Sequence, residues 1–398
     1  MAIDTRKAGT EAQGPRASLL NDPKFRALAY QILVVGAIVA IGWYLVSNTL
    51  NNLARQNIAT GFGFMDREAS FAISESLIDY SPASNYGRAF VVGLLNTLKA
   101  SLLGIVLATI LGTIVGISRL SSNWLVARLA TVYVETVRNI PLLLQLFLWY
   151  GVVTESLPHP RQALSPVEGV FLSNRGFLLP APVADPAWLW AIGAFFVGIA
   201  LAVAVKVWAD RRQAATGWQF PTLRFNLLLI LGLPVLAWML AGAPTVMEVP
   251  ELRGFNFVGG ISLSPEFAAI LIGLVVYTAS FIAEIVRSGI LAVNYGQSEA
   301  GLALGLQRSQ VLRLVVLPQS LRVIVPPMTS QYLNLTKNSS LAVAIGYPDV
   351  VSIANTTMNQ TGQAIEGVAL IMAVYLTISL AISLFMNWYN KHIALVER

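Results

Sequence analysis

The chain has 398 residues, of which 56% are hydrophobic and only 12% are charged, and its formal net charge is +6. A sequence this apolar does not suit a water-soluble protein, and its repeated apolar runs of bilayer length indicate an integral membrane protein. Cysteine is absent and histidine occurs only twice, at distant positions, which excludes disulfides, thiolate chemistry and a His/Cys metal site. The cations are spread among the loops, which favours topology control and contact with membrane lipid over nucleic-acid binding.

Eight apolar runs are long enough to cross a bilayer, which predicts an all-α, polytopic helical bundle. The chain begins with a polar stretch of 27 residues that holds five cations, and no small-residue cleavage site closes the first apolar run. We therefore expect a cytoplasmic tail rather than a cleaved signal peptide. The expected spans are 28–49, 89–118, 126–153, 188–207, 226–243, 267–287, 317–335 and 368–388.

The second span carries a stripe of small residues at four-residue spacing: Gly104, Ala108, Gly112 and Gly116. This spacing makes one helix face smooth, so that another helix can approach closely. Static packing in the bundle is the favoured interpretation, and a moving interface between subunits is the alternative. Lys99, early in the same span, is expected to extend its ammonium group toward the membrane interface.

Charged residues in the third span need an explanation, because charge is costly in hydrocarbon. Glu135 and Arg138 stand three residues apart on one helix face, and the Asn-Ile-Pro sequence that follows is expected to loosen the helix ahead of Gln145. Two interpretations stay open: a self-neutralising pair near the inner interface, or an inner gate with Gln145 facing a substrate path. The same pairing recurs at the inner end of the sixth span, in Glu284 and Arg287.

The segment after the sixth span turns polar and predicts a short helix at about 297–305. Ser298 is the expected N-cap, Glu299 supplies an acid in the first turn, and Gly305 is the expected terminator. Such a helix has about two turns. Arginines follow it closely, so the positive-inside rule places it in the cytoplasm.

The spacing from Glu299 to Pro318 resembles the EAA loop of permease subunits of bacterial ABC importers. The matching pattern is Glu299-Ala300-Gly301, three residues, Gly305, nine residues, and Val315-x-Leu317-Pro318. In that family the loop is the coupling helix that docks into a cleft of the ATPase. The resemblance implies an ATPase-coupling role for Ser298, Glu299, Ala300, Gly301, Gly305 and Pro318. The sequence departs from the family at Gly301, where Ala is usual, and at Val315, where Ile is more frequent.

The seventh span is expected to be a helix broken by the adjacent prolines Pro326 and Pro327. The uncharged part of this span, between its flanking charged residues, is too short to face lipid throughout. We therefore expect other helices to surround the span, or the span to line a cavity. Its polar groups and one cation suit a carboxylate or zwitterion. The candidate substrate-path residues are Gln331, Asn334, Lys337, Asn338 and Ser339. A plain helix end that reaches the outer surface is the competing interpretation.

The segments 93–145 and 283–346 are similar to the polar amino-acid branch of these permeases, and the first span and the insertion are similar to the longer permeases of general L-amino-acid importers. The resemblance implies a bacterial inner-membrane transport subunit rather than an enzyme. A periplasmic binding protein would deliver an amino acid, two related permeases would form the path as a heterodimer, and two ATPase subunits would drive alternating access. The chain has no G-x-x-x-x-G-K-[ST] sequence, so we expect ATP and Mg in the ATPase and no cofactor on this chain.

A secondary transporter driven by an ion gradient is the alternative function. Such a protein also has many spans and broken helices, and it typically carries inverted repeats. No duplicated hydropathy pattern is evident in this chain, and gradient coupling leaves the match to the EAA loop unexplained.

The predicted spans and loops divide the chain into consecutive parts. Cations are concentrated in the segments placed inside, which puts both termini in the cytoplasm. The expected parts are a cytoplasmic tail at 1–27, a first helix at 28–49, a periplasmic loop at 50–88, the first part of the permease core at 89–153, an insertion with periplasmic loops and two spans at 154–265, the second part of the core with the coupling helix at 266–390, and a cytoplasmic tail at 391–398.

Overall fold

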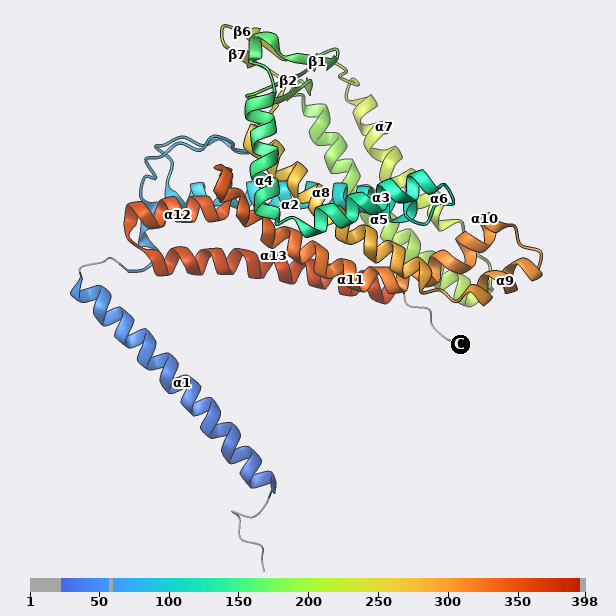
Figure 1. Ribbon diagram of the computed structural model, residues 1–398, viewed down its shortest axis with the longest axis horizontal. Helices are drawn as coiled ribbons and strands as arrows, with labels where there is room; N and C mark the ends of the chain where they lie inside the picture. The colour runs from blue at the N-terminus through green and yellow to red at the C-terminus, as the bar shows by residue number, and fades with distance from the viewer. Residues whose placement is uncertain (1–22, 57–59, 394–398) are drawn as a thin grey trace, which may run out of the picture.

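The computed structural model describes residues 23–56 and 60–393, so most of the two predicted tails lies outside it. Within these residues seven helices are long and apolar enough to cross a membrane, or eight if one bent pair counts as a single span. The predicted polytopic helical bundle is confirmed. Helix α1 (Pro23–Arg55) stands apart from the bundle with its apolar side chains exposed (Figure 1).

The core of the bundle is built on α2 (Tyr86–Ser118) and α8 (Pro265–Leu291), which run parallel and pack along much of their length. Against them lie α11 (Leu317–Asn338) and, further out, α13 (Ala364–Ile393). Large apolar side chains fill the space between these helices. Among the fully buried ones are Leu146, Ile270, Leu274, Ile282 and Leu335.

The predicted third span at 126–153 consists of two helices, α3 (Trp124–Asn139) and α4 (Leu142–Gly151), which are long and apolar enough to cross a membrane only as a bent pair. The bend between them is 106°. Ile140 adopts an extended conformation, as expected of a residue before proline, and Pro141 offers no N–H to continue the helix. The predicted loosening at this sequence is confirmed, although the break is larger than expected.

The seventh span shows the opposite result, because α11 continues through both prolines and the predicted break at Pro326 and Pro327 is wrong. Proline fits helical φ, and what it removes is the hydrogen bond to the carbonyl four residues earlier. The irregular turns lie at the two ends of α11 instead. They are a π-helical turn at Leu312–Val316 and a 3-10 segment at Ser339–Ile345.

The insertion contains two long helical segments joined by a short loop, as predicted. Helix α5 (Pro186–Thr216) is followed by α6 (Thr222–Leu227) and α7 (Leu233–Leu240), which a π-helical turn connects. The loops around them form small antiparallel sheets that the sequence did not predict (Figure 1). The strands are β1 (Leu164–Val167), β2 (Val170–Ser173), β3 (Gly176–Leu179), β4 (Ala181–Pro182), β5 (Met247–Glu248), β6 (Glu251–Arg253), β7 (Asn256–Val258) and β8 (Ile261–Leu263). Pairing of β3 with β8 joins the two ends of the insertion.

The loop before α2 folds back onto the bundle. Its Glu75 forms a salt bridge with Lys99, whose ammonium also lies 3.9 Å from the centroid of the Phe267 ring. Asn96 holds the same loop by donating from Nδ2 to the carbonyl of Glu75 at 2.8 Å. Lys99 is therefore paired inside the protein, and the expectation that it extends freely to the interface is wrong.

Candidate functional site

A cavity of about 280 Å3 with polar walls lies between α8 and α11. Three of the five candidate residues of the seventh span line it, and α8 supplies the facing wall. The lining residues are Gln331, Asn334 and Asn338 on α11 and Tyr277, Thr278 and Phe281 on α8. Spacings of three and four residues place the three amides on one helix face, which is why the sequence could predict them as a group.

The other two candidates of the seventh span lie elsewhere. Lys337 is exposed and is not part of the cavity wall. Ser339 is buried, and its hydroxyl donates to the carbonyl of Thr336 at 2.7 Å. The positive charge beside the cavity comes from α3, because the guanidinium carbon of Arg138 lies 4.9 Å from the centroid of the Phe281 ring.

Sequence reasoning missed the α8 wall. Tyr277, Phe281 and Glu284 stand four and three residues apart, so a helix presents them on one face that runs from the cavity toward the C-terminal end of α8. That spacing is readable in the sequence. The pairing of this face with the amides of α11 is not, because nothing local specifies which two helices meet.

In the third span no ion pair joins Glu135 and Arg138 within the described part of the chain, so the interpretation as a self-neutralising pair is wrong. Glu135 is exposed, and its backbone carbonyl accepts a hydrogen bond from the side chain of Asn139 at 2.7 Å. Gln145 is buried and donates from Nε2 to the carbonyls of Val137 and Ile140, both at 2.9 Å. Its amide therefore stabilises the bend between α3 and α4.

Toward the C-terminal end of α8 the predicted pair of Glu284 and Arg287 is confirmed, with Nη2 of the arginine 2.7 Å from Oε1 of the carboxylate. A third group joins it, since Arg119 at the C-terminal end of α2 forms a salt bridge with the same carboxylate. One acid thus holds two cations and ties α2 to α8. This contact could not be predicted from the sequence, because Arg119 is far from α8 along the chain.

The predicted coupling segment forms helix α9 (Tyr295–Ala303), two residues earlier than expected. Its N-cap is Asn294, whose side chain accepts from the N–H of Gly296 at 2.9 Å, so the assignment of Ser298 as N-cap is wrong. Asparagine is as good an N-cap residue as serine. The helix therefore begins at Tyr295, directly after Asn294. Glu299 accordingly lies beyond the first turn. Gly305 has φ +83°, and its predicted role as terminator is confirmed.

Helix α9 lies at the end of the bundle opposite α12 (Val350–Thr361) (Figure 1). Glu299 and Ala300 are exposed on it, and Leu304 just beyond it is 84% exposed. Gly301 is buried against α10 (Arg308–Val311), where an added Cβ would lie 3.0 Å from Cγ2 of Val311. A π-helical turn then leads into α11, with Pro318 in the first turn of that helix. The exposed face of α9 is therefore free to contact another protein.

The stripe of small residues on α2 is buried along its whole length. A Cβ added to Gly112 would lie 2.7 Å from Cβ of Ile282, and one added to Gly116 would lie 2.7 Å from the carbonyl oxygen of Ala283. Gly104 faces Leu335 of α11. The stripe is thus a packing seam inside this chain, and the alternative of an interface between subunits is wrong for the described structure.

A buried carboxylate that sequence reasoning did not single out lies at the end of the bundle opposite α9. Asp349 is fully buried and caps α12, with its side chain accepting from the N–H of Ser352 at 2.8 Å. Burial raises its pKa to about 7, because the charged form loses its hydration, while the hydrogen bonds from the backbone oppose this effect.

Comparison with known proteins gives one consistent family. The family described as binding-protein-dependent transport system inner membrane component matches residues 214–395. The chain is 51% identical to the general L-amino acid transport system permease protein of Rhizobium johnstonii, over 96% of this chain and 95% of the relative. It is 53% identical to a putative amino-acid ABC transporter permease protein of Escherichia coli, over 95% of this chain and 96% of the relative.

A third relative is the glutamate/glutamine/aspartate/asparagine transport system permease protein of Rhodobacter capsulatus, which is 42% identical over the full length of both chains. These matches extend across the first span and the insertion as well as the core, so they cover the parts that the family model leaves out. The chain belongs to the family of inner-membrane permease components of binding-protein-dependent ABC transporters.

Proposed function

We propose that this permease imports polar amino acids and that its cargo passes the polar cavity between α8 and α11. One observation carries the proposal: of the two helices that line this cavity, α8 directly precedes α9 in the chain and α11 follows it after the short α10 and a π-helical turn. A movement of α9 therefore acts on both walls of the cavity. The names of the relatives, all of them amino-acid permeases, support the class of cargo.

The chemistry of the cavity suits a zwitterion. Three side-chain amides both donate and accept hydrogen bonds, and Tyr277 and Thr278 add hydroxyl groups. Arg138, stacked on Phe281, contributes a positive charge at the edge, where a carboxylate can approach. Gln145 holds the bend between α3 and α4 that follows Arg138, so the gate role considered for the third span is part of this proposal.

Coupling to ATP hydrolysis is assigned to α9 and the residues around it. The exposed carboxylate of Glu299 and the exposed apolar side chains of Tyr295 and Leu304 form a mixed surface suited to a protein cleft. The ATP and Mg then belong to the partner ATPase, present in two copies. Buried Gly301 holds α9 on α10, so that force on α9 passes into α11.

The complete transporter in this proposal contains a second, related permease, which makes a heterodimer, and a periplasmic amino-acid-binding protein. Both termini of this chain lie in the cytoplasm, as the distribution of cations favours. The small sheets around β1–β3 and β8 then lie on the periplasmic side, where the binding protein delivers its cargo.

Uptake assays in proteoliposomes that hold the whole transporter test the proposal. Labelled amino acid should enter when ATP is supplied to the ATPase side, and an uncoupler of ion gradients should leave the rate unchanged. Uptake that persists without ATP and collapses with the uncoupler would support the alternative of a secondary transporter.

A further inference from the structure

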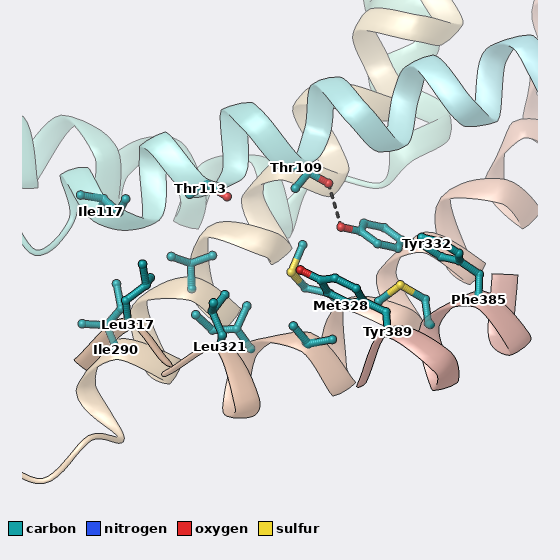
Figure 2. Close-up of a pocket in the computed structure, with 14 residues that line it drawn as sticks. Thr109, Thr113, Ile117, Ile290, Leu317, Leu321, Met328, Tyr332, Phe385 and Tyr389 are labelled. Carbon is teal, nitrogen blue, oxygen red and sulfur yellow. Dashed lines mark hydrogen bonds between the residues drawn. The ribbon is translucent and has the colours of Figure 1, made fainter. Parts of the chain in front are cut away.

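The cavity drawn in Figure 2 offers no group that binds a charged ligand. It lies between α2, α8, α11 and α13, has a volume of about 380 Å3, and none of the described residues that line it is charged. Two of its polar groups satisfy each other, since the hydroxyls of Thr109 and Tyr332 lie 2.9 Å apart (Figure 2). Exposed cations gather instead at the far end of the insertion, where α5 leads into α6.

The insertion forms a helical hairpin whose apolar side chains are open to the surroundings. Helix α5 packs on α6 and α7, and large side chains on the outer faces, such as Trp190, Phe196 and Leu240, are exposed. Both arms are long and apolar enough to cross a membrane, so this surface suits lipid. Strand β4 precedes α5 and pairs with β5, which follows α7, so the turn at 217–221 is the far tip of the hairpin.

Aromatic side chains mark both ends of the hairpin. Trp188 and Trp238 lie near the paired strands, with ring centroids 6.2 Å apart. At the tip, the ring centroid of Phe220 lies 5.5 Å from that of Trp208 and 4.9 Å from that of Phe225. At about 1.5 Å per residue, Trp188 and Trp208 are about 30 Å apart along α5, which is the thickness of the hydrocarbon core. Aromatic rings at this separation are typical of the two membrane interfaces, which places the tip at the level of the lipid headgroups.

Four exposed cations belong to this tip, with one acid among them in the sequence. Within the described part of the chain none of the four forms an ion pair, not even with the acid Asp210. The four cations are Lys206, Arg211, Arg212 and Arg224. The tip therefore carries an excess of positive charge that the chain itself does not neutralise.

Arg212 is the cation that the tip holds in a defined place. Its guanidinium carbon lies 5.2 Å from the ring centroid of Trp208 and 4.9 Å from that of Trp218. These contacts are made through the faces of the rings, and the N–H groups of the guanidinium form a planar fork that matches phosphate geometry. The two tryptophans thus hold an anion-binding group at the surface of the tip.

We propose that this basic tip, residues 206–225, binds the phosphate groups of anionic phospholipids in the cytoplasmic leaflet, with Arg212 as the central ligand. The side of the membrane rests on the orientation that belongs to the proposed function, in which α5 crosses toward the cytoplasm. The cytoplasmic leaflet has a negative surface potential, which attracts clustered lysines and arginines beside a membrane span. Lipid is favoured over a protein partner, because the cations continue directly from helix faces that are open to lipid and are interleaved with aromatic rings at headgroup level.

The local lipid composition at the tip tests the proposal. Ala215→Cys places the only cysteine of the chain in the last turn of α5, and a fluorophore on it is quenched by lipids that carry a quencher on an acyl chain. The whole transporter is placed in vesicles of phosphatidylcholine and phosphatidylglycerol, with one of the two lipids labelled at a time. Phosphatidylglycerol should be enriched at the tip, and Arg212→Gln should lower this enrichment about fivefold, the effect of one basic residue at an anionic surface.

Arg253→Gln is the matched control. Arg253 is exposed in the same insertion but lies in β6, at the other end of the hairpin, so its loss should leave the enrichment unchanged. Arg212→Lys keeps the charge without the planar fork and should retain part of the enrichment. Enrichment in Arg212→Gln equal to that of the unchanged protein overturns the proposal. Shielding of the fluorophore from both lipids when the ATPase binds also overturns it, because the tip then contacts a protein.

The side of the membrane is measured separately with the same cysteine. A maleimide that does not cross membranes should label Ala215→Cys only after spheroplasts are opened. Labelling of closed spheroplasts would overturn the orientation, and with it the assignment to the cytoplasmic leaflet. The quenching measurement needs neither ATP nor cargo, so a failure to find enriched phosphatidylglycerol refutes lipid binding by the tip, whereas the uptake assay tests import independently.

Discussion

The seam between α2 and α8 gives the sharpest quantitative prediction, through the change Gly112→Ala. The new Cβ would lie 2.7 Å from both Cβ and Cγ2 of Ile282 and 2.9 Å from the carbonyl oxygen of Ala279, distances that require the helices to separate. Overpacking of this kind costs about 1–3 kcal/mol. Alanine recovers about 1 kcal/mol through its better helix propensity, so the expected net loss of stability is at most about 2 kcal/mol, toward the upper end because backbone and Cβ atoms are both in the way.

The matched control is Gly193→Ala in α5, where no atom lies within 4 Å of the added Cβ. That variant gains the helix propensity without the clash and should be neutral or slightly more stable. Unfolding of both variants by titration with sodium dodecyl sulfate in mixed micelles measures the difference. If Gly112→Ala is as stable as Gly193→Ala, the close packing of α2 on α8 is refuted.

Three further predictions concern the polar cavity, the ion cluster of Arg119, Glu284 and Arg287, and the buried carboxylate of Asp349. Asn334→Leu should raise the KM for uptake about tenfold, the effect of one lost hydrogen bond to a polar ligand. Ser330→Leu, on the exposed face of α11, is the control. Equal KM values for the two variants would show that the cargo does not pass the cavity. Glu284→Gln should destabilise the protein by about 2 kcal/mol, a value between those of exposed and buried ion pairs. In thermal unfolding, this substitution should cost less stability when Arg119→Met is already present. If the two losses of stability simply add, the carboxylate is not shared between the two arginines. Because burial raises the pKa of Asp349 from its ordinary value of 3.8 to about 7, the contribution of this carboxyl group to stability is fully present below pH 3.8 and falls by up to about 1.4 kcal/mol per pH unit as the pH rises to 7. Asp349→Asn should flatten this slope in thermal unfolding measured across that range, and an unchanged slope would assign it to another group.

Much of the architecture could be predicted from the sequence, because in a bilayer apolar length alone specifies where a helix crosses. The amides at 331, 334 and 338 could be grouped for a similar reason, since the helical period is a local property. The terminator Gly305 was also predictable, because few other residues adopt positive φ without strain.

The errors arose where tertiary contacts outweigh local preference. Pro326 and Pro327 lie exposed on α11 and the helix continues through them, because proline fits helical φ, whereas Pro141 follows a residue in an extended conformation and α3 ends there. Glu75, the partner of Lys99, and Arg119, the second partner of Glu284, come from distant segments, and sequence spacing within one helix does not reveal them. The small sheets of the insertion likewise depend on pairing between strands far apart in the chain.

The central claim is that α9 transmits the action of the ATPase to the helices that line the cavity. The most direct measurement is the ratio of amino acid imported to ATP hydrolysed in proteoliposomes that contain the whole transporter with Glu299→Arg, beside Glu299→Gln as the milder change. Our account predicts that Glu299→Arg lowers this ratio severely while the binding protein still delivers its cargo, with Glu299→Gln in between. A ratio equal to that of the unchanged transporter would contradict it.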